Sequence, residues 1–166
     1  MATPEILRAA VQFPDLLGEL AKRTKGDPKV LVELSLLKFG TSDMARCVRA
    51  GLYVRYNFLN ESHTISQAIH TPEGSYWHAI MHRREPDYSN AMYWYHSVGH
   101  HPVFDELSRQ EVVLKALGAT KFDPFEFVNL CEAAATDKSK FDAAVVVQRA
   151  EWQALFEHCV KGAGIR

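Results

Sequence analysis

The sequence predicts an all-α fold, a single-domain multi-helix bundle of about seven to nine helices joined by short connections. Prolines and glycines recur at intervals that would bracket helices of about 8 to 20 residues. Between these breaks, apolar residues repeat at helical spacing, as in Met44, Val48 and Leu52. Strand signals are almost absent, with no Asn-Gly or Asp-Gly hairpin turn. The whole chain, residues 1–166, is therefore expected to form one helical domain.

Helix boundaries in the first half of the chain follow from caps, prolines and glycines. The helical segments are expected over residues 5–12, 15–24, 29–39, about 43–59, about 60–70 and 72–85. Thr71-Pro72 has the order that a helix start prefers, because proline fits the first helical position. Segment 29–39 alternates enough to suit a strand, but Gly40 just past its end favours a helix. Pro86 ends the last of these helices at Glu85, since it disfavours helical geometry in the preceding residue.

The same signals continue in the second half. The helical segments there are expected over residues 87–99, 103–118, 125–135 and about 140–160. Asp87 is the expected cap of the first, with Asn90 turned back toward it. Pro102 opens the second, and Asp123-Pro124 repeats the pairing of a cap with a proline before the third. In the last segment an apolar face includes Phe141 and Trp152.

Composition excludes several classes of function. The formal net charge of −1 and a pI near 6.7 leave no basic face of the kind that nucleic-acid binders carry, so we expect no nucleic acid. No apolar run approaches the roughly 20 residues needed to span a bilayer, so no membrane association is expected. The three cysteines are far apart and lack a CxxC spacing. They indicate buried thiols in a reducing compartment, and the expected location is cytoplasmic.

The residues that titrate, stack and bind metals are concentrated in the central region 53–104. Seven of the eight histidines lie between His63 and His101. All six tyrosines and two of the three tryptophans also fall within 53–104, whereas the flanking helices carry ordinary apolar core patterns. This asymmetry predicts a functional site in the central region.

The most specific local pattern is His78-x-x-x-His82 followed by Glu85. Positions i, i+4 and i+7 share one face of a helix, so two imidazoles one turn apart could chelate Zn, Fe, Ni or Mn. Glu85 could complete a set of two histidines and one carboxylate. Further ligands could come from four other residues, namely His63, His70, Asp87 and His101. An i,i+4 pair among eight histidines is common by chance, and Ala79 occupies the position of the glutamate in HExxH, so a polar network without metal is an equal alternative.

Charged and aromatic neighbours of this pair are the remaining candidates. Arg83 and Arg84 point about 100° apart, so one of them could clamp a carboxylate or phosphate while the other neutralises the helix end. Glu85 is the expected general base, because Asp87 would be engaged in capping. The candidate ligand-binding residues, which could equally serve as caps and core, are Trp77, Asp87, Asn90, Trp94 and His101.

These patterns lead to three functional hypotheses. The first is a small metal-dependent enzyme, hydrolytic or O₂-dependent, with His78 and His82 as metal ligands and a small-molecule substrate. The second is a non-catalytic module that binds a small ligand in a pocket rich in histidine and aromatic residues. The third is an interaction protein, such as a homodimer, in which Tyr, Trp and Arg form the interface. No segment resembles a known family closely enough to choose between them.

Overall fold

The computed structural model describes residues 12–165, and in this part of the chain it contains nine helices and no strand, which confirms the all-α prediction. The helices are α2 (Pro28–Leu36), α3 (Asp43–Arg55), α4 (Leu59–Ser66), α5 (Pro72–Arg84), α6 (Tyr88–Val98), α7 (Pro102–Leu107), α8 (Glu111–Leu117), α9 (Pro124–Ala133) and α10 (Lys138–Gly162). The helix expected over 5–12 lies, except for its last residue, outside the described residues.

Side-chain caps begin the helices that carry most of the candidate residues. Thr71 Oγ1 accepts the N–H of Gly74 at 3.3 Å at the start of α5. Asp87 Oδ1 accepts the N–H of Asn90 at 3.3 Å at the start of α6. Each such bond satisfies an N–H that the helix cannot, and is typically worth about 1 kcal/mol. The starts of α5 and α6 are therefore set by local sequence, as predicted.

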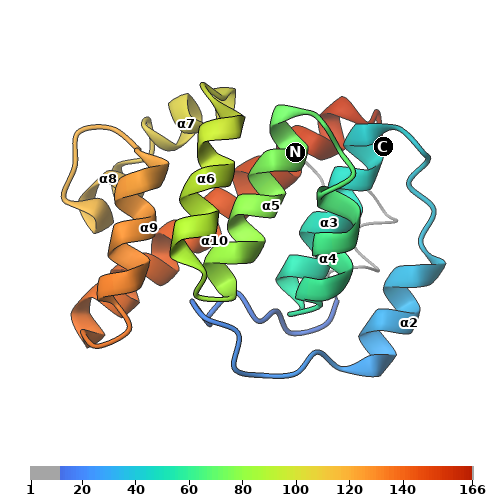
Figure 1. The fold of residues 1–166 in the computed structure, drawn as a ribbon, viewed down its shortest axis with the longest axis horizontal. Helices are drawn as coiled ribbons and strands as arrows, with labels where there is room; N and C mark the ends of the chain where they lie inside the picture. The colour runs from blue at the N-terminus through green and yellow to red at the C-terminus, as the bar shows by residue number, and fades with distance from the viewer. Residues whose placement is uncertain (1–11, 166) are drawn as a thin grey trace.

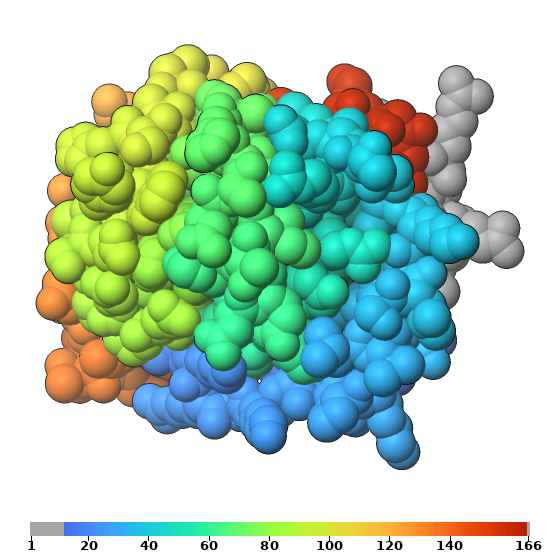
Figure 2. Space-filling view, turned by 45° about the vertical axis from the view of Figure 1, so that its right-hand side comes forward, coloured from blue at the N-terminus to red at the C-terminus, as the bar shows by residue number. Residues whose placement is uncertain are grey.

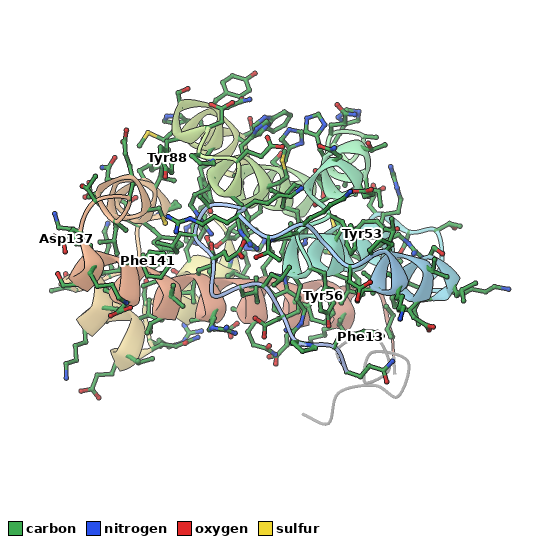
Figure 3. The ribbon with its side chains drawn as sticks, turned by 90° about the horizontal axis from the view of Figure 1, so that it is seen from below. Phe13, Tyr53, Tyr56, Tyr88, Asp137 and Phe141 are labelled. Atoms are coloured by element: carbon green, nitrogen blue, oxygen red, sulfur yellow. The ribbon has the colours of Figure 1, made fainter. Side chains whose placement is uncertain are left out.

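Segment 12–27 is an irregular strap, and the prediction of a helix over 15–24 is wrong. The carboxylate of Glu19 accepts the N–H of Thr24 and of its neighbour, bonds that a helix would direct to backbone carbonyls. Gln148 of α10 donates to two strap carbonyls at 2.8 Å each. Side chains thus satisfy the polar backbone of the strap. Figure 3, which views the molecule from below, shows the strap in blue crossing in front of the helices.

The helix expected over 103–118 is divided into α7 and α8. Ser108 follows α7, and its Oγ donates to the Phe104 carbonyl at 2.7 Å and accepts the Phe122 N–H at 2.9 Å. This hydroxyl offers the backbone an alternative to continuing the helix. Gln110 is extended, with ψ of 105°, and α8 begins after it.

Helix α5 lies at the centre of the bundle and packs against α3, α4 and α6. Figure 1 shows it in green between these neighbours, with α10 passing behind. Gly51 of α3 permits the close approach, because a Cβ at this position would lie 2.6 Å from the Trp77 ring. Trp77 in turn packs against Trp152 of α10, with ring centroids 6.3 Å apart. The central region of the sequence is therefore also central in space.

The 25-residue helix α10 is the longest in the described chain and forms one side of the core. It buries Glu151, which accepts a hydrogen bond from Arg83 of α5, and Trp152, which packs against Trp77 of α5. None of the helices between residues 12 and 165 combines the length and the apolar composition that a bilayer span requires.

Candidate metal centre

His78 and His82 lie one turn apart on the same face of α5. Their Nε2 atoms are 2.9 Å apart, and the two residues are only 2% and 7% exposed. Two imidazole nitrogens bound to one zinc ion, each about 2.0–2.1 Å from it, would be about 3.3 Å apart. A small adjustment of the side chains would therefore place a metal ion between them.

Helix α4 adds a third imidazole, that of His63. Its ring centroid is 4.7 Å from that of His78 and 5.5 Å from that of His82. One ring nitrogen from each of the three residues lies within 4.8 Å of the others. His70, which was also predicted as a further metal ligand, is exposed in the connection before α5. We call His63, His78 and His82 the three-histidine cluster.

Ser66 of α4 contacts His78 at Nδ1. Its Oγ lies 3.3 Å from His78 Nδ1 and 3.4 Å from the carbonyl oxygen of His63. The hydroxyl has one proton, which it can donate to this carbonyl or to an unprotonated Nδ1. When the proton goes to the carbonyl, His78 is the Nδ1–H tautomer, with its lone pair on Nε2.

Carboxylates favour the same tautomer of His82. Glu85 Oε2 lies 3.4 Å and Asp87 Oδ2 3.9 Å from His82 Nδ1. Ionised carboxylates can only accept, so their proximity favours a proton on this nitrogen. Asn90 Nδ2 lies 3.2 Å from His82 Nε2, where its N–H faces a lone pair. A metal-bound histidine commonly has a carboxylate on its other nitrogen in this way, which orients the ring and raises its basicity.

With both protons on Nδ1, the lone pairs of His78 and His82 would face each other across the 2.9 Å between the two Nε2 atoms, and with one proton on Nε2 the rings would share a hydrogen bond. Burial, together with the neighbouring imidazoles, lowers the pKa of His78 to about 3. Burial also lowers the pKa of His82 by more than Glu85 and Asp87 raise it. Both rings are thus neutral at pH 7, and each can bind a metal ion through its unprotonated nitrogen. The arrangement fits a metal ion.

Helix α6 forms a wall of the cluster with two of the predicted ligand-binding residues. The Trp94 ring lies over His78, with centroids 4.0 Å apart and planes tilted by 31°. Asn90, one turn earlier, contacts His82. Asp87 caps α6 and turns its second oxygen toward His82. In Figure 2 the green surface of α4 and α5 meets the yellow-green surface of α6 on this face of the molecule.

The two arginines point into the interior, away from this wall. Arg83 is 1% exposed, and its guanidinium donates to Glu151 at 2.6 Å and to the Tyr95 hydroxyl at 2.8 Å. Arg84 is fully buried, and its guanidinium donates to two backbone carbonyls at 2.9 Å each. Buried charges need such partners, and removing one of them is costly. Both guanidinium groups are therefore engaged with the core rather than with the three-histidine cluster.

Trp77 and His101, the other predicted ligand-binding residues, also lie away from this cluster. Trp77 is fully buried in the core. His101 is 1% exposed, and its ring faces Glu73 and His158. Glu73 Oε1 lies 3.6 Å from His101 Nε2 and 3.2 Å from His158 Nε2. We call Glu73, His101 and His158 the Glu73 cluster.

Sequence reasoning missed Ser66 and the Glu73 cluster. Ser66 follows His63 by three residues and so shares its face of α4, which is a local signal that could have been used. The contact between His158 and Glu73 joins residues 85 positions apart, so it could not be predicted from local spacing.

Two surface hollows lie elsewhere, one beside α8 and one between α7 and the start of α9, and the three-histidine cluster lines neither. No family model, curated protein or solved structure matches this chain. Its function must therefore be inferred from the site itself.

Proposed function

We propose that the protein binds one divalent transition metal ion through the Nε2 atoms of His78 and His82 and a ring nitrogen of His63. The observation that supports this most is the 2.9 Å between the two buried Nε2 atoms, with Ser66 and Glu85 beside the Nδ1 atoms of the two rings, where each can accept a hydrogen bond. A hydrogen bond between the rings in place of a metal would require Ser66 to donate its hydroxyl proton to His78 Nδ1 instead of to the His63 carbonyl.

Zinc suits this ligand set best among the metals considered. Catalytic zinc sites have three protein ligands and an open position for water, whereas structural sites have four. The described residues group three imidazoles here, with no cysteine among them. Iron oxygenases use two histidines and one carboxylate, and the nearby carboxylate of Glu85 faces Nδ1 of His82 instead of the converging Nε2 atoms. This placement favours hydrolysis over O₂ chemistry.

The proposed activity is hydrolysis of a carboxylic ester by metal-activated water. The water oxygen would bond to the acyl carbon, the bond from that carbon to the alcohol oxygen would break, and the alcohol would leave with one of the water protons. The second proton would be released as the product acid ionises. In this proposal Glu85 orients His82 through Nδ1, so it serves as a positioning residue rather than as the general base.

Elemental analysis of untagged protein tests the metal site. After dialysis against Zn²⁺ and removal of excess, we expect about one zinc per chain. His63→Ala, His78→Ala and His82→Ala should each reduce this content strongly. His70→Ala, which removes an exposed histidine outside the cluster, should leave it unchanged and is the matched control.

Replacement by Co²⁺ gives a second readout, because a tetrahedral Co²⁺ site with imidazole ligands absorbs strongly in the visible range. Folded protein that takes up no metal, or His78→Ala protein that retains it, would contradict the proposal. Release of p-nitrophenol from p-nitrophenyl acetate by zinc-loaded protein, lost in His82→Ala, then tests hydrolysis.

A further inference from the structure

The helices that surround the three-histidine cluster bring no solvent-exposed lysine or arginine to it. Within α4, α5 and α6 the only basic residues of these two types are Arg83 and Arg84, and both are buried. Enzymes that act on phosphate or carboxylate groups normally present such a side chain to the anion. The composition of these helices therefore argues against an anionic substrate.

Uncharged side chains flank the cluster along α4 and α6, and we call them, together with Glu85 and Asp87, the rim. Asn60 of α4 precedes His63 by three residues and Gln67, the C-cap of α4, follows it by four, so they share its face, and both are exposed. On α6, Ser97 lies one turn beyond Trp94 and is also exposed. These side chains offer hydrogen bonds to a neutral ligand but no charge.

The charges at one end of the rim are negative. Glu85 and Asp87 have side chains that are 37% and 45% exposed, and both lie beside His82. Like charges repel, so an anionic group that approaches this end is disfavoured. A carboxylate formed by ester hydrolysis would be repelled in the same way, which favours its release.

Trp94 supplies an apolar platform beside the metal ligands. Its ring covers His78, and it is only partly buried. Tyr93, whose residue is 63% exposed, meets it edge to face with centroids 5.7 Å apart. Aromatic faces of this kind hold flat apolar groups by stacking.

We propose that the three-histidine cluster takes an uncharged acyl substrate with a flat apolar group that rests on Trp94, and that it discriminates against substrates bearing a phosphate or carboxylate. This substrate class rests on the proposed metal-dependent function. It follows from the uncharged side chains of the rim, the acids at its end and the aromatic platform, all of which lie on one face.

Hydroxamates, which coordinate metals, test the proposal on Co²⁺-loaded protein by titration of the visible absorption. Benzohydroxamate should bind about tenfold more tightly than acetohydroxamate, because its ring can stack on Trp94. Adding a 4-carboxylate to the ring should weaken binding several-fold. Trp94→Ala should remove the advantage of the ring and leave the affinity for acetohydroxamate within about twofold.

Gln67→Lys places a cation on the rim and should strengthen binding of 4-carboxybenzohydroxamate specifically. Thr64→Lys, on the same helix and about 100° from His63, is the matched control and should not. Equal affinity for benzo- and acetohydroxamate, or a preference for the carboxylate in the unaltered protein, would overturn the inference while metal binding stands. Co²⁺ uptake with no hydroxamate binding would overturn both the substrate class and the hydrolytic activity. Absence of Co²⁺ uptake would overturn the metal site itself.

Discussion

Two groups of titratable residues lie around α5, and each brings three potential metal ligands within 4.8 Å of one another. In the three-histidine cluster, serine and carboxylate partners lie beside the Nδ1 atoms of His78 and His82, and the two Nε2 atoms converge. In the Glu73 cluster the order is reversed. His101 Nδ1 accepts the backbone N–H of Val103 at 3.2 Å, so its proton is on Nε2 and points toward Glu73.

The difference shows that proximity alone does not make a metal site. His101 uses its lone pair to cap α7 and offers a proton where a ligand would need a lone pair. Glu73 Oε1 lies 3.6 Å from this nitrogen, and the contact with His101 is the first cause of the lowered pKa of Glu73, about 2. The Glu73 cluster therefore presents a proton at His101, whereas our proposal places a cation between the Nε2 atoms of His78 and His82.

The largest expected effect is a difference in stabilisation by zinc. Free Zn²⁺ at about 100 times its dissociation constant should raise the free energy of unfolding by about 2.7 kcal/mol, because it binds the folded state. His78→Ala should abolish this increase, and His101→Asn should preserve it. Chemical denaturation with and without Zn²⁺ measures the effect. Equal loss in both variants would remove the distinction between the clusters.

The second effect concerns the carboxylate behind His82. Glu85→Gln removes the negative charge from the Nδ1 side and should weaken zinc affinity by about tenfold, the lower end of what such outer partners contribute. Competition with a chromophoric chelator measures it. Asp87→Asn is the matched control, since asparagine also caps helices and Asp87 lies farther away, at 3.9 Å. An unchanged affinity in Glu85→Gln would show that the carboxylate does not orient the ligand.

The third effect is specific to the Glu73 cluster and depends on pH. Glu73→Gln should lower the free energy of unfolding at pH 7 by about 1 kcal/mol, the usual scale of a hydrogen bond. The folded-state pKa of about 2 lies below the ordinary value of 4.5, so the stabilisation is complete above about pH 4.5 and is lost as pH falls toward 2. The difference between variant and unaltered protein should shrink over that range. Urea unfolding at pH 7, 4.5 and 3 measures it, and a constant difference would exclude a role for the carboxylate charge.

Local sequence determined much of the fold. Thr71-Pro72 and Asp87 place the starts of α5 and α6 because a cap and a proline act within one turn. The predicted helix over 15–24 failed because its partners are remote. Gln148 binds strap carbonyls from about 130 residues away, and Glu19 captures the amides that a helix would use.

In the candidate site, too, features that depend on local sequence could be predicted and features that depend on remote residues could not. The spacing of His78 and His82 predicted a shared face, and the structure brings Asn90 and Trp94 to that face as well. The direction of Arg83 could not be predicted, because Glu151, its partner, is 68 residues away. The protonated nitrogen of each histidine is likewise set by tertiary neighbours, and spacing says nothing about it.

The smallest effect changes no affinity or stability, yet it tests the comparison most directly. Two-bond ¹H–¹⁵N correlation spectra distinguish the tautomers of neutral histidines. At pH 7 without added metal, His78 and His82 should appear as Nδ1–H, and His101 as Nε2–H, because Ser66 and Glu85 accept at the first two and Val103 donates at the third. Addition of Zn²⁺ should shift the Nε2 resonances of His78 and His82 and leave those of His101 in place. An Nε2–H tautomer at His78 in the metal-free protein would mean that the two rings share a hydrogen bond, and the three-histidine cluster would then be satisfied without a metal ion.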